Sequence, residues 1–172
     1  MDKQLQLLEE VTVLFSTATS IEEFASAFDV FVEAYGNIEK TALYLMDPYS
    51  NDLRLLHAKG FSEVERLEAE RTAWERHPGW VIRNRKNLVS GEGDSESDNI
   101  SVSSKRSFKV NSRIYFPLLH NDECYGCVGY VSELPDFYNE EFKSLSSFLT
   151  RIMSLNCHRI IHIVKEKEVG TI

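Results

Sequence analysis

The chain has 172 residues, 42% of them hydrophobic and 11% aromatic, and a formal net charge of −8. This length suits one domain with a sizeable core, and this composition is typical of a globular protein rather than a disordered one. The acidic balance argues against a general nucleic-acid binder, because phosphate contacts require clustered Lys and Arg.

Two amphipathic helices are predicted at the start of the chain. Residues 3–16 predict the first, because apolar side chains recur there at helical spacing: Leu5, Leu8, Val11, Leu14 and Phe15. Ser20 and Glu23 have the spacing of a capping box, in which each side chain accepts a hydrogen bond from an otherwise unbonded backbone N–H. The second helix begins there, ends at Gly36-Asn37, and carries four aromatic residues on one face: Phe24, Phe28, Phe31 and Tyr35.

A hairpin and two shorter helices are predicted next. Residues 38–47 and 53–60 predict two strands joined by a turn over 48–52. Ser62 and Glu65 repeat the capping-box spacing before a helix whose apolar side chains are Val64, Leu67 and Trp74. Residues 77–86 predict a further helix, with Pro78 in the first turn, where a proline costs no hydrogen bond. Residues 87–90 predict a short strand.

The second half of the chain contains a polar segment, a hairpin and a long helix. Residues 91–107 are serine-rich, with acidic residues at every second position from Glu92 to Asp98, which predicts a long or partly disordered loop. Residues 112–120 and 124–132 form the clearest hairpin, with its turn at Asn121-Asp122. The long helix is predicted from about Asn139 towards the C-terminus.

Cys124 and Cys127 form a Cys-x-x-Cys motif inside a predicted strand. Residues three apart on a strand point to opposite faces and lie about 10 Å apart, whereas a disulfide requires Cα atoms closer than about 7 Å. No helix N-terminus that would activate a redox pair and no second pair of metal ligands accompanies them. We therefore predict two reduced, separate thiols.

Three cysteines without framework spacing, and no signal peptide or bilayer-spanning run, predict a cytoplasmic protein without membrane insertion.

The other candidate metal and catalytic patterns are weak. His158 and His162 lie one helical turn apart, a spacing that can chelate zinc, but no glutamate base lies between them and no third ligand is obvious. The acidic alternation lacks the ordered glycine and distal glutamate of a calcium loop. No Ser-His-Asp set, phosphate-binding glycine loop or pair of catalytic carboxylates can be identified. We predict no metal site and no catalytic activity, and the sequence identifies no cofactor.

Taken in order, four segments resemble a GAF domain, a small-molecule sensing module of signalling proteins. They are TALYLMDPYSNDLRLLHAKGF (41–61), HPGWVIRNRKNLV (77–89), SRIYFPLLHNDECYGCVGYVS (112–132) and PDFYNEEFKSLSSF (135–148). In that family a strand ends in Leu-x-Asp, a glycine-containing helix follows, a later strand ends in Pro-Leu, and a Phe-containing link opens the last helix. The resemblance covers about residues 20 to 155.

The chain departs from several GAF patterns. The family's helix often opens with two glycines three residues apart; Gly79 fits the second, and Arg76 stands at the position of the first. The Asn-Lys-Phe-Asp-Glu signature of cyclic-nucleotide-binding members is not present. GAF-type enzymes that reduce free methionine sulfoxide carry cysteines around the loop before the hairpin, and residues 90–111 contain none. The familiar ligands therefore have no residue-level support.

The resemblance implies an α+β fold, similar to that of PAS domains, with an antiparallel sheet and the terminal helices on one face. Shorter helices and the long loop would cover a ligand cavity on the other face. Alternation separates Ala42, Tyr44 and Met46 from Thr41, Leu43 and Leu45, and the Tyr44 set is assigned to the cavity. Arg113 is the most informative candidate, because a desolvated cation calls for an anionic partner; the aromatic candidates have an ordinary core position as their alternative. The candidate ligand-binding residues are Tyr44, Met46, His77, Trp80, Arg113, Tyr115 and Tyr130.

The expected organisation is an N-terminal helix for signalling or dimerisation (1–19), a GAF-like domain (20–155), and an extension of the last helix with a tail (156–172). We predict a non-catalytic sensor that binds an unidentified small molecule, closes the 91–107 loop over it, and controls an effector domain or protein by a population shift. Two alternatives stay open: a methionine sulfoxide reductase using Cys124 or Cys127, and a purely structural dimerisation module. A homodimer through the terminal helices is predicted because the last helix is apolar on two faces; the alternative is that both faces are buried within one chain. The two faces carry Leu145, Leu149 and Ile152 on one side, and Met153, Ile160 and Val164 on the other.

Overall fold

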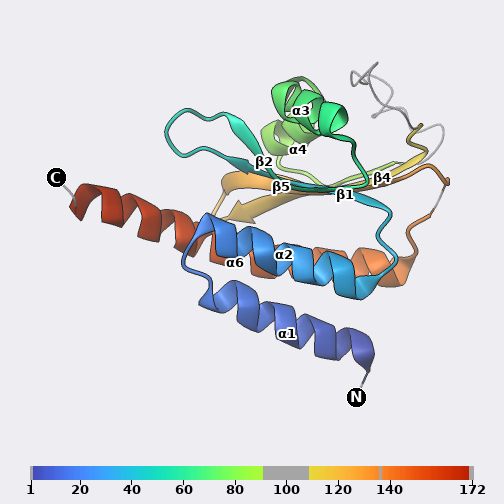
Figure 1. The fold of residues 1–172 in the computed structure, drawn as a ribbon, viewed down its shortest axis with the longest axis horizontal. Helices are drawn as coiled ribbons and strands as arrows, with labels where there is room; N and C mark the ends of the chain where they lie inside the picture. The colour runs from blue at the N-terminus through green and yellow to red at the C-terminus, as the bar shows by residue number, and fades with distance from the viewer. Residues whose placement is uncertain (1, 91–108, 136, 171–172) are drawn as a thin grey trace.

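The computed structural model describes residues 2–90, 109–135 and 137–170, and it has helices packed on both faces of one antiparallel sheet (Figure 1). The predicted 91–107 loop lies outside the described residues. In chain order the elements are α1 (Lys3–Thr17), α2 (Ile21–Tyr35), β1 (Lys40–Met46), β2 (Leu53–Lys59), α3 (Glu63–Arg71), the 3-10 helix η1 (Ala73–Glu75), α4 (His77–Asn84), β3 (Leu88–Ser90), β4 (Ser112–His120), β5 (Glu123–Ser132) and α6 (Glu140–Gly170).

The sheet separates two layers of helices. Its strands lie in the order β2-β1-β5-β4-β3. On one side, here called the long-helix face, α2 and α6 lie against the strands and α1 packs outside them. On the other side, here called the short-helix face, α3, η1 and α4 cover the sheet (Figure 1). The α+β architecture predicted from the sequence is confirmed.

Side-chain caps start the helices where the sequence predicts them. The Ser62 hydroxyl accepts a hydrogen bond from the Glu65 N–H at 3.2 Å, and the Glu65 carboxylate accepts one from the Ser62 N–H at 2.9 Å. Ser20 accepts from the N–H of Glu23 at 3.1 Å, but the Glu23 carboxylate bonds the N–H of Thr19 instead of closing the box. A cap of this kind contributes about 1 kcal/mol to helix stability.

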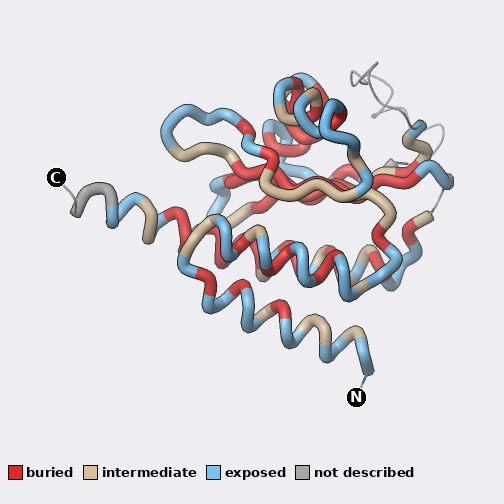
Figure 2. The backbone as a smooth tube through the Cα atoms, in the orientation of Figure 1, coloured by how far each residue is buried: buried red, intermediate tan, exposed pale blue. Residues whose placement is uncertain are grey.

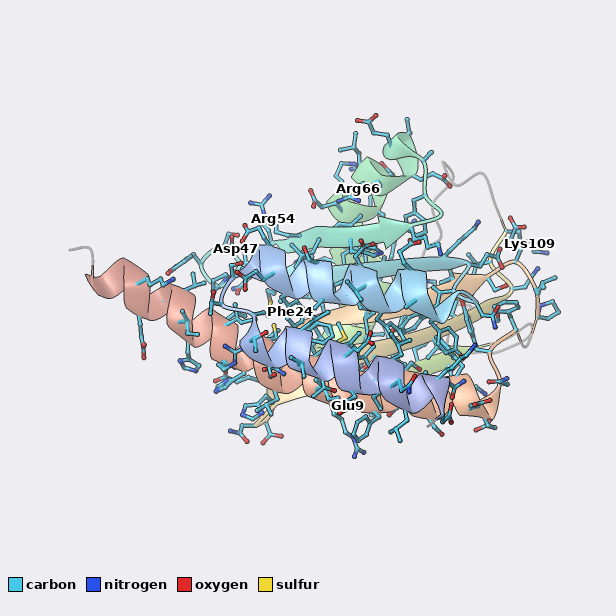
Figure 3. The ribbon with its side chains drawn as sticks, turned by 60° about the horizontal axis from the view of Figure 1, so that its bottom comes forward. Glu9, Phe24, Asp47, Arg54, Arg66 and Lys109 are labelled. Atoms are coloured by element: carbon cyan, nitrogen blue, oxygen red, sulfur yellow. The ribbon has the colours of Figure 1, made fainter. Side chains whose placement is uncertain are left out.

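A phenylalanine-rich core fills the long-helix face. Phe28 and Phe31 of α2 are completely buried there, and the rings of Phe15 and Phe24 meet with their centroids 5.1 Å apart. The contact between Phe15 and Phe24 holds α1 to α2, and Phe24 lies between these two helices in Figure 3. Figure 2 shows the same layering, with buried backbone concentrated in the central strands and on the inner sides of the helices.

A smaller cluster fills the short-helix face, where Ala42 and Tyr44 of β1 pack together with Ala69 of α3 and Val81 of α4. The predicted alternation along β1 is confirmed, because its intervening leucines belong to the other core. Hydrogen bonds fasten α3 to the edge strand β2. The Leu55 N–H donates to the Glu70 carboxylate at 2.8 Å, and the Arg66 guanidinium (labelled in Figure 3) donates to the Leu55 carbonyl at 3.4 Å.

The predicted apolar face of α3 is wrong. Val64 and Leu67 are exposed, and the helix instead turns Ala69 and Glu65 inward. The reason is polar anchoring: the carboxylates of Glu65 and Glu70 satisfy backbone N–H groups at the start of α3 and on β2, and these bonds fix how the helix is rotated. Trp74, the third predicted residue, lies in η1 and is partly buried against the short-helix cluster.

A bulge interrupts the β4–β5 hairpin. Asn121 and Asp122 have φ angles of 50° and 67°, which is the conformation of a two-residue hairpin turn. His120 pairs with Glu123, but the register then shifts between Pro117 and Leu119. The extra residue belongs to β5, at Gly126, where an added β carbon would lie 2.0 Å from the Tyr44 carbonyl oxygen on β1. From Cys127 onwards, each side chain of β5 points to the face of the sheet opposite to the one that uninterrupted alternation from Cys124 would give.

The two predicted apolar stripes of α6 are both covered within one chain. Leu149, Met153 and Ile160 are buried, and Leu145, Ile152 and Val164 are partly buried against the same core. The expectation of a surplus stripe is therefore wrong: α6 lies between the sheet and α1, so it needs apolar residues on two sides. None of the helices within the described ranges combines the length and the apolar character that crossing a membrane requires.

Candidate functional site

A stack of groups from three elements lies on the short-helix face. The Tyr115 ring of β4 lies over Gly129 of β5, where an added β carbon would come within 2.3 Å of the ring. The His77 ring stacks on Tyr115, with 5.8 Å between ring centroids and 16° between ring planes. Both rings are buried. Because His77 is the first residue of α4, the stack fixes the N-terminal end of α4 above the sheet.

Most of the predicted ligand-binding residues lie on this face. Tyr44 and Tyr115 belong to the short-helix cluster, and Met46 and Trp80 pack against it. Arg113 is half-buried and precedes Tyr115 by two residues in β4, so strand geometry places it on the same face. Together with His77, they account for all of the predicted residues except one.

That exception is Tyr130, which lies in the long-helix core. Its ring packs among aromatic rings of α2, β4 and α6, including Phe142 at 5.0 Å and Phe28 at 6.4 Å between centroids. The Gly126 bulge is the physical reason, because it pairs Tyr130 with Ile114 and so turns the ring towards α2 and α6. Within the described ranges its hydroxyl has no hydrogen-bond partner. The prediction that Tyr130 lines the cavity face is therefore corrected.

Arg76, which was not among the predicted site residues, is buried at the start of α4. It is the N-cap residue of α4, and only 8% of its surface is exposed. Among the described residues, neither Nε nor Nη1 of its guanidinium has a hydrogen-bond partner. The sequence does single out Arg76, because a charged side chain stands there at a position where the GAF pattern has a glycine.

All three cysteines are free and buried. Cys124 and Cys127 belong to the same short-helix cluster, so the prediction that they face opposite sides of the sheet is wrong, again because of the Gly126 bulge. Burial raises the pKa of the Cys124 thiol, and burial together with the neighbouring Cys124 raises the pKa of Cys127 well above its usual value. Burial likewise raises the pKa of Cys157, which lies in the long-helix core. Buried protonated thiols are poor nucleophiles.

Three histidines meet where the β4–β5 hairpin reaches α6. The ring centroids of His120 and His158 are 4.2 Å apart, and those of His158 and His162 are 4.4 Å apart. The Tyr125 hydroxyl lies 2.5 Å from Nδ1 of His158 and donates to the Glu123 carboxylate at 2.8 Å. The first pair of rings is tilted by 40° and the second meets edge-on at 69°, and within the described ranges no group of three or more His, Cys, Asp or Glu side chains could hold a metal ion.

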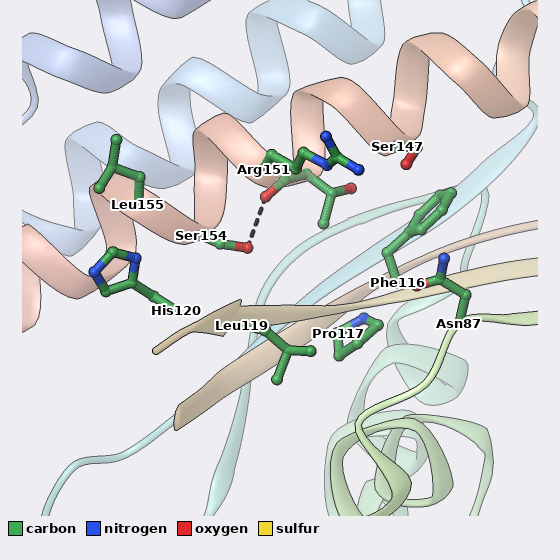
Figure 4. A pocket seen from close by; sticks show the side chains of 10 residues that line it. Asn87, Phe116, Pro117, Leu119, His120, Ser147, Arg151, Ser154 and Leu155 are labelled. Carbon is green, nitrogen blue, oxygen red and sulfur yellow. Dashed lines mark hydrogen bonds between the residues drawn. The ribbon is translucent and has the colours of Figure 1, made fainter. Parts of the chain in front are cut away.

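A groove of about 450 Å³ lies on the other side of the molecule, between β4 and α6 (Figure 4). Phe116 and Leu119 form part of its apolar wall. The hydroxyls of Thr150 and Ser154 donate at 2.7 Å to carbonyls of α6 itself, the latter drawn as the dashed line in Figure 4. These two donors are already used, and the other polar residues that line the groove are Asn87, His120, Ser147 and Arg151.

Of the comparisons with known proteins, the one with solved structures identifies the fold. No family model and no curated protein matches the chain. Solved structures do match. The GAF domain of the Acinetobacter phosphoenolpyruvate-protein phosphotransferase has a TM-score of 0.70 at 15% identity, covering 92% of this chain and 95% of that one. The corresponding GAF domain from Coxiella burnetii has a TM-score of 0.69 at 14% identity, with coverages of 98% and 97%.

A second kind of protein shares this fold. The free methionine-R-sulfoxide reductase from Neisseria meningitidis, solved in complex with its substrate, has a TM-score of 0.68 at 22% identity and 94% coverage of both chains. At these identities a likeness establishes the fold alone. The chain has a GAF fold.

Proposed function

We propose that this chain, with its GAF fold, is a non-catalytic regulatory domain that binds a small molecule on the short-helix face. The observation that carries the proposal is the chemical contrast between the two faces of the sheet. The long-helix face is an aromatic and aliphatic core, and the buried hydroxyls of Ser146, Thr150 and Ser154 beside it donate to carbonyls of α6 itself. The short-helix face has a smaller apolar cluster with buried polar groups beside it, including Arg76 and His77. Ligand sites are mostly apolar surfaces with a few convergent polar groups.

The candidate contacts are the residues that the structure gathers on that face. Tyr44, Met46, Trp80 and Tyr115 would supply apolar and aromatic surface, and His77 and Arg113 would supply polar contacts. The stack of His77 on Tyr115 supports a preformed site, because it holds the start of α4 in place. A ligand that alters this stack would act on β4 and β5, which also contact α6.

The terminal helices would carry the output. The C-terminal part of α6 extends past the sheet (Figure 1), where it is available to an effector domain or protein. Phe148 and Leu155 of α6 are 51% and 56% exposed, and they are seven residues apart, so they lie on one side of the helix. With the exposed Leu5 and Val13 of α1, they support a homodimer through the terminal helices, although its contacts differ from the predicted stripes.

The dimer is tested by sedimentation at micromolar concentration. Replacing Phe148 and Leu155 together by glutamate should convert a dimer into a monomer, because the charges would be buried in the interface. Val64 and Leu67, which are equally exposed on α3, provide the matched control, and the same double replacement there should leave the dimer intact. A monomeric parent protein, or a dimer insensitive to the α6 changes, would contradict this interface.

The sulfoxide reductases among the structural neighbours define the competing function. The raised pKa values of the buried Cys124, Cys127 and Cys157 thiols argue against it, because a thiolate must attack the sulfoxide sulfur.

Three free thiols are also what a reducing compartment maintains, which supports the predicted cytoplasmic location.

One experiment tests the binding proposal against the enzyme. A metabolite library is screened for compounds that raise the melting temperature, and the hits are retested on Trp80→Ala and on Tyr130→Phe. A ligand on the short-helix face should lose most of its effect in the first variant and none in the second. In parallel, free methionine sulfoxide is incubated with the protein and dithiothreitol. Turnover that disappears in Cys124→Ser or Cys127→Ser would replace the regulatory proposal with the enzyme.

A further inference from the structure

The buried guanidinium of Arg76 requires an explanation. An arginine side chain stays charged at any pH that a folded protein tolerates. Taking such a charge out of water is expensive unless an anion or several hydrogen-bond acceptors replace the water. Only 8% of the Arg76 surface is exposed, yet its Nε and Nη1 have no hydrogen-bond partner within the part of the chain that the structure describes.

Glu75, which adjoins Arg76 in the sequence, is exposed, and three acidic side chains of α3 form their hydrogen bonds with other residues. The Glu65 carboxylate accepts a hydrogen bond from the Ser62 backbone, and the Glu70 carboxylate accepts one from the Leu55 backbone. The Glu68 carboxylate receives three hydrogen bonds from Arg71, at 2.9, 3.0 and 3.3 Å. Arg76 itself forms no ion pair among the described residues.

The position of Arg76 points to the ligand site. It immediately precedes His77, whose ring stacks on Tyr115 above the sheet, so its backbone is fixed on the short-helix face. It is also the N-cap of the eight-residue helix α4, and its side chain makes no capping bond. The positive end of the α4 dipole and the charge of the guanidinium therefore favour an anion at the same place.

We propose that Arg76 is the anion-receiving residue of the small-molecule site, and that the ligand carries a carboxylate or phosphate group that contacts its guanidinium. This inference rests on the proposed function, which places the ligand on the short-helix face. It adds the chemical class of the ligand and a binding residue specific to this chain, since the glycine of the GAF pattern has no charge to offer.

The test compares the parent protein with Arg76→Met, which keeps much of the side-chain volume and removes the charge. Melting temperature is measured in sodium phosphate, in sodium succinate and in sodium chloride at equal ionic strength. Phosphate, succinate or both should raise the melting temperature of the parent above its value in chloride, and the responding anion identifies the oxyanion class. Arg76→Met should weaken apparent affinity for that anion at least about tenfold.

Two further variants sharpen the result. Arg71→Met removes a guanidinium that is exposed and paired with Glu68 on the same side of the molecule, and it should respond to anions as the parent does. Arg76→Lys keeps a charge without the planar guanidinium and should keep part of the response; it decides the matter if Arg76→Met does not fold. In chloride, Arg76→Met should melt higher than the parent, because it no longer buries a charge that has no ion-pair partner among the described residues.

Failure of the inference can be told apart from failure of the proposed function. An Arg76→Met protein that folds but melts lower than the parent in chloride overturns the inference, because the guanidinium then has a structural partner. An equal anion response in the parent and in Arg76→Met overturns it too, as does the absence of any response in the parent. If uncharged library compounds still stabilise the parent and lose their effect in Trp80→Ala, the binding function stands and only the anion assignment falls.

Discussion

Replacing Tyr130 by phenylalanine should stabilise the protein. The side chain is completely buried among aromatic rings of the long-helix core, and its hydroxyl has no hydrogen-bond partner within the described ranges. A buried hydroxyl without a partner costs on the order of 1–3 kcal/mol relative to water, whereas phenylalanine keeps the ring packing and removes the polar atom. Allowing for the small gap left by the oxygen, the expected gain is about 1 kcal/mol.

Tyr138→Phe is the matched control, because the two rings are neighbours with centroids 6.4 Å apart. The Tyr138 hydroxyl donates to the Val131 carbonyl at 2.9 Å, so its removal deletes a hydrogen bond and should cost about 1 kcal/mol. For a domain of this size 1 kcal/mol shifts the melting temperature by about 2–4 °C, so the variants should differ by about 4–8 °C.

Thermal and urea unfolding of the three proteins measure this difference. A Tyr130→Phe protein that unfolds below the parent would refute the reasoning, since the hydroxyl would then have a partner. Loss of ligand binding in this variant would restore Tyr130 to the site.

Gly126→Ala should lower the free energy of unfolding by about 1–3 kcal/mol, because its β carbon would lie 2.0 Å from the Tyr44 carbonyl oxygen; a change under about 0.5 kcal/mol would speak against the bulge geometry. Burial, followed by the charges of two neighbouring histidines, lowers the pKa of His158. The unfolded chain then binds the proton more readily, so stability from His158 is present above about pH 6.5 and is lost as pH falls. His158→Gln should flatten the decline in melting temperature below that pH, and an equal decline in both proteins would contradict this. Ser62→Ala should lower the free energy of unfolding, measured with urea, by about 1 kcal/mol, and an unchanged value would mean that the Ser62 cap does not stabilise α3.

The elements with strong local signals are the ones that the sequence predicts well. The strand expected over 112–120 spans Ser112–His120, and the helix expected after Ser62 begins at Glu63. Turn residues, helix caps and apolar alternation depend only on residues that are close together in the sequence. They can therefore be recognised before any tertiary contact is known. The sequence also places Tyr44, Met46, His77 and Tyr115 on one face, although their role in binding stays a prediction.

Features that depend on which helices and strands pack together in the fold could not be predicted from local sequence signals. The two apolar sides of α6 indicated a dimer, but α1 folds back over one of them within the same chain. Val64 and Leu67 looked like the inner side of α3 until the Glu65 and Glu70 hydrogen bonds fixed its rotation. The burial of Arg76 is of this kind too, because periodicity does not reveal that a charged residue at a helix start will be buried in the fold.

One glycine decides which residues of β5 can reach a ligand. The turn pairs His120 with Glu123, and continuing that register regularly would place Tyr130 opposite Arg113, on the face of Tyr115. The extra residue at Gly126 shifts the pairing by one, so that Tyr130 faces the long-helix core. The same shift places Gly129 opposite Tyr115, and only a residue without a β carbon leaves room for that ring and for the His77 ring stacked on it. A glycine inside a strand is a recognised signal of a bulge. The shift that removes a tyrosine from the candidate site therefore also makes room for the His77–Tyr115 stack that holds α4, and with it Arg76, in place.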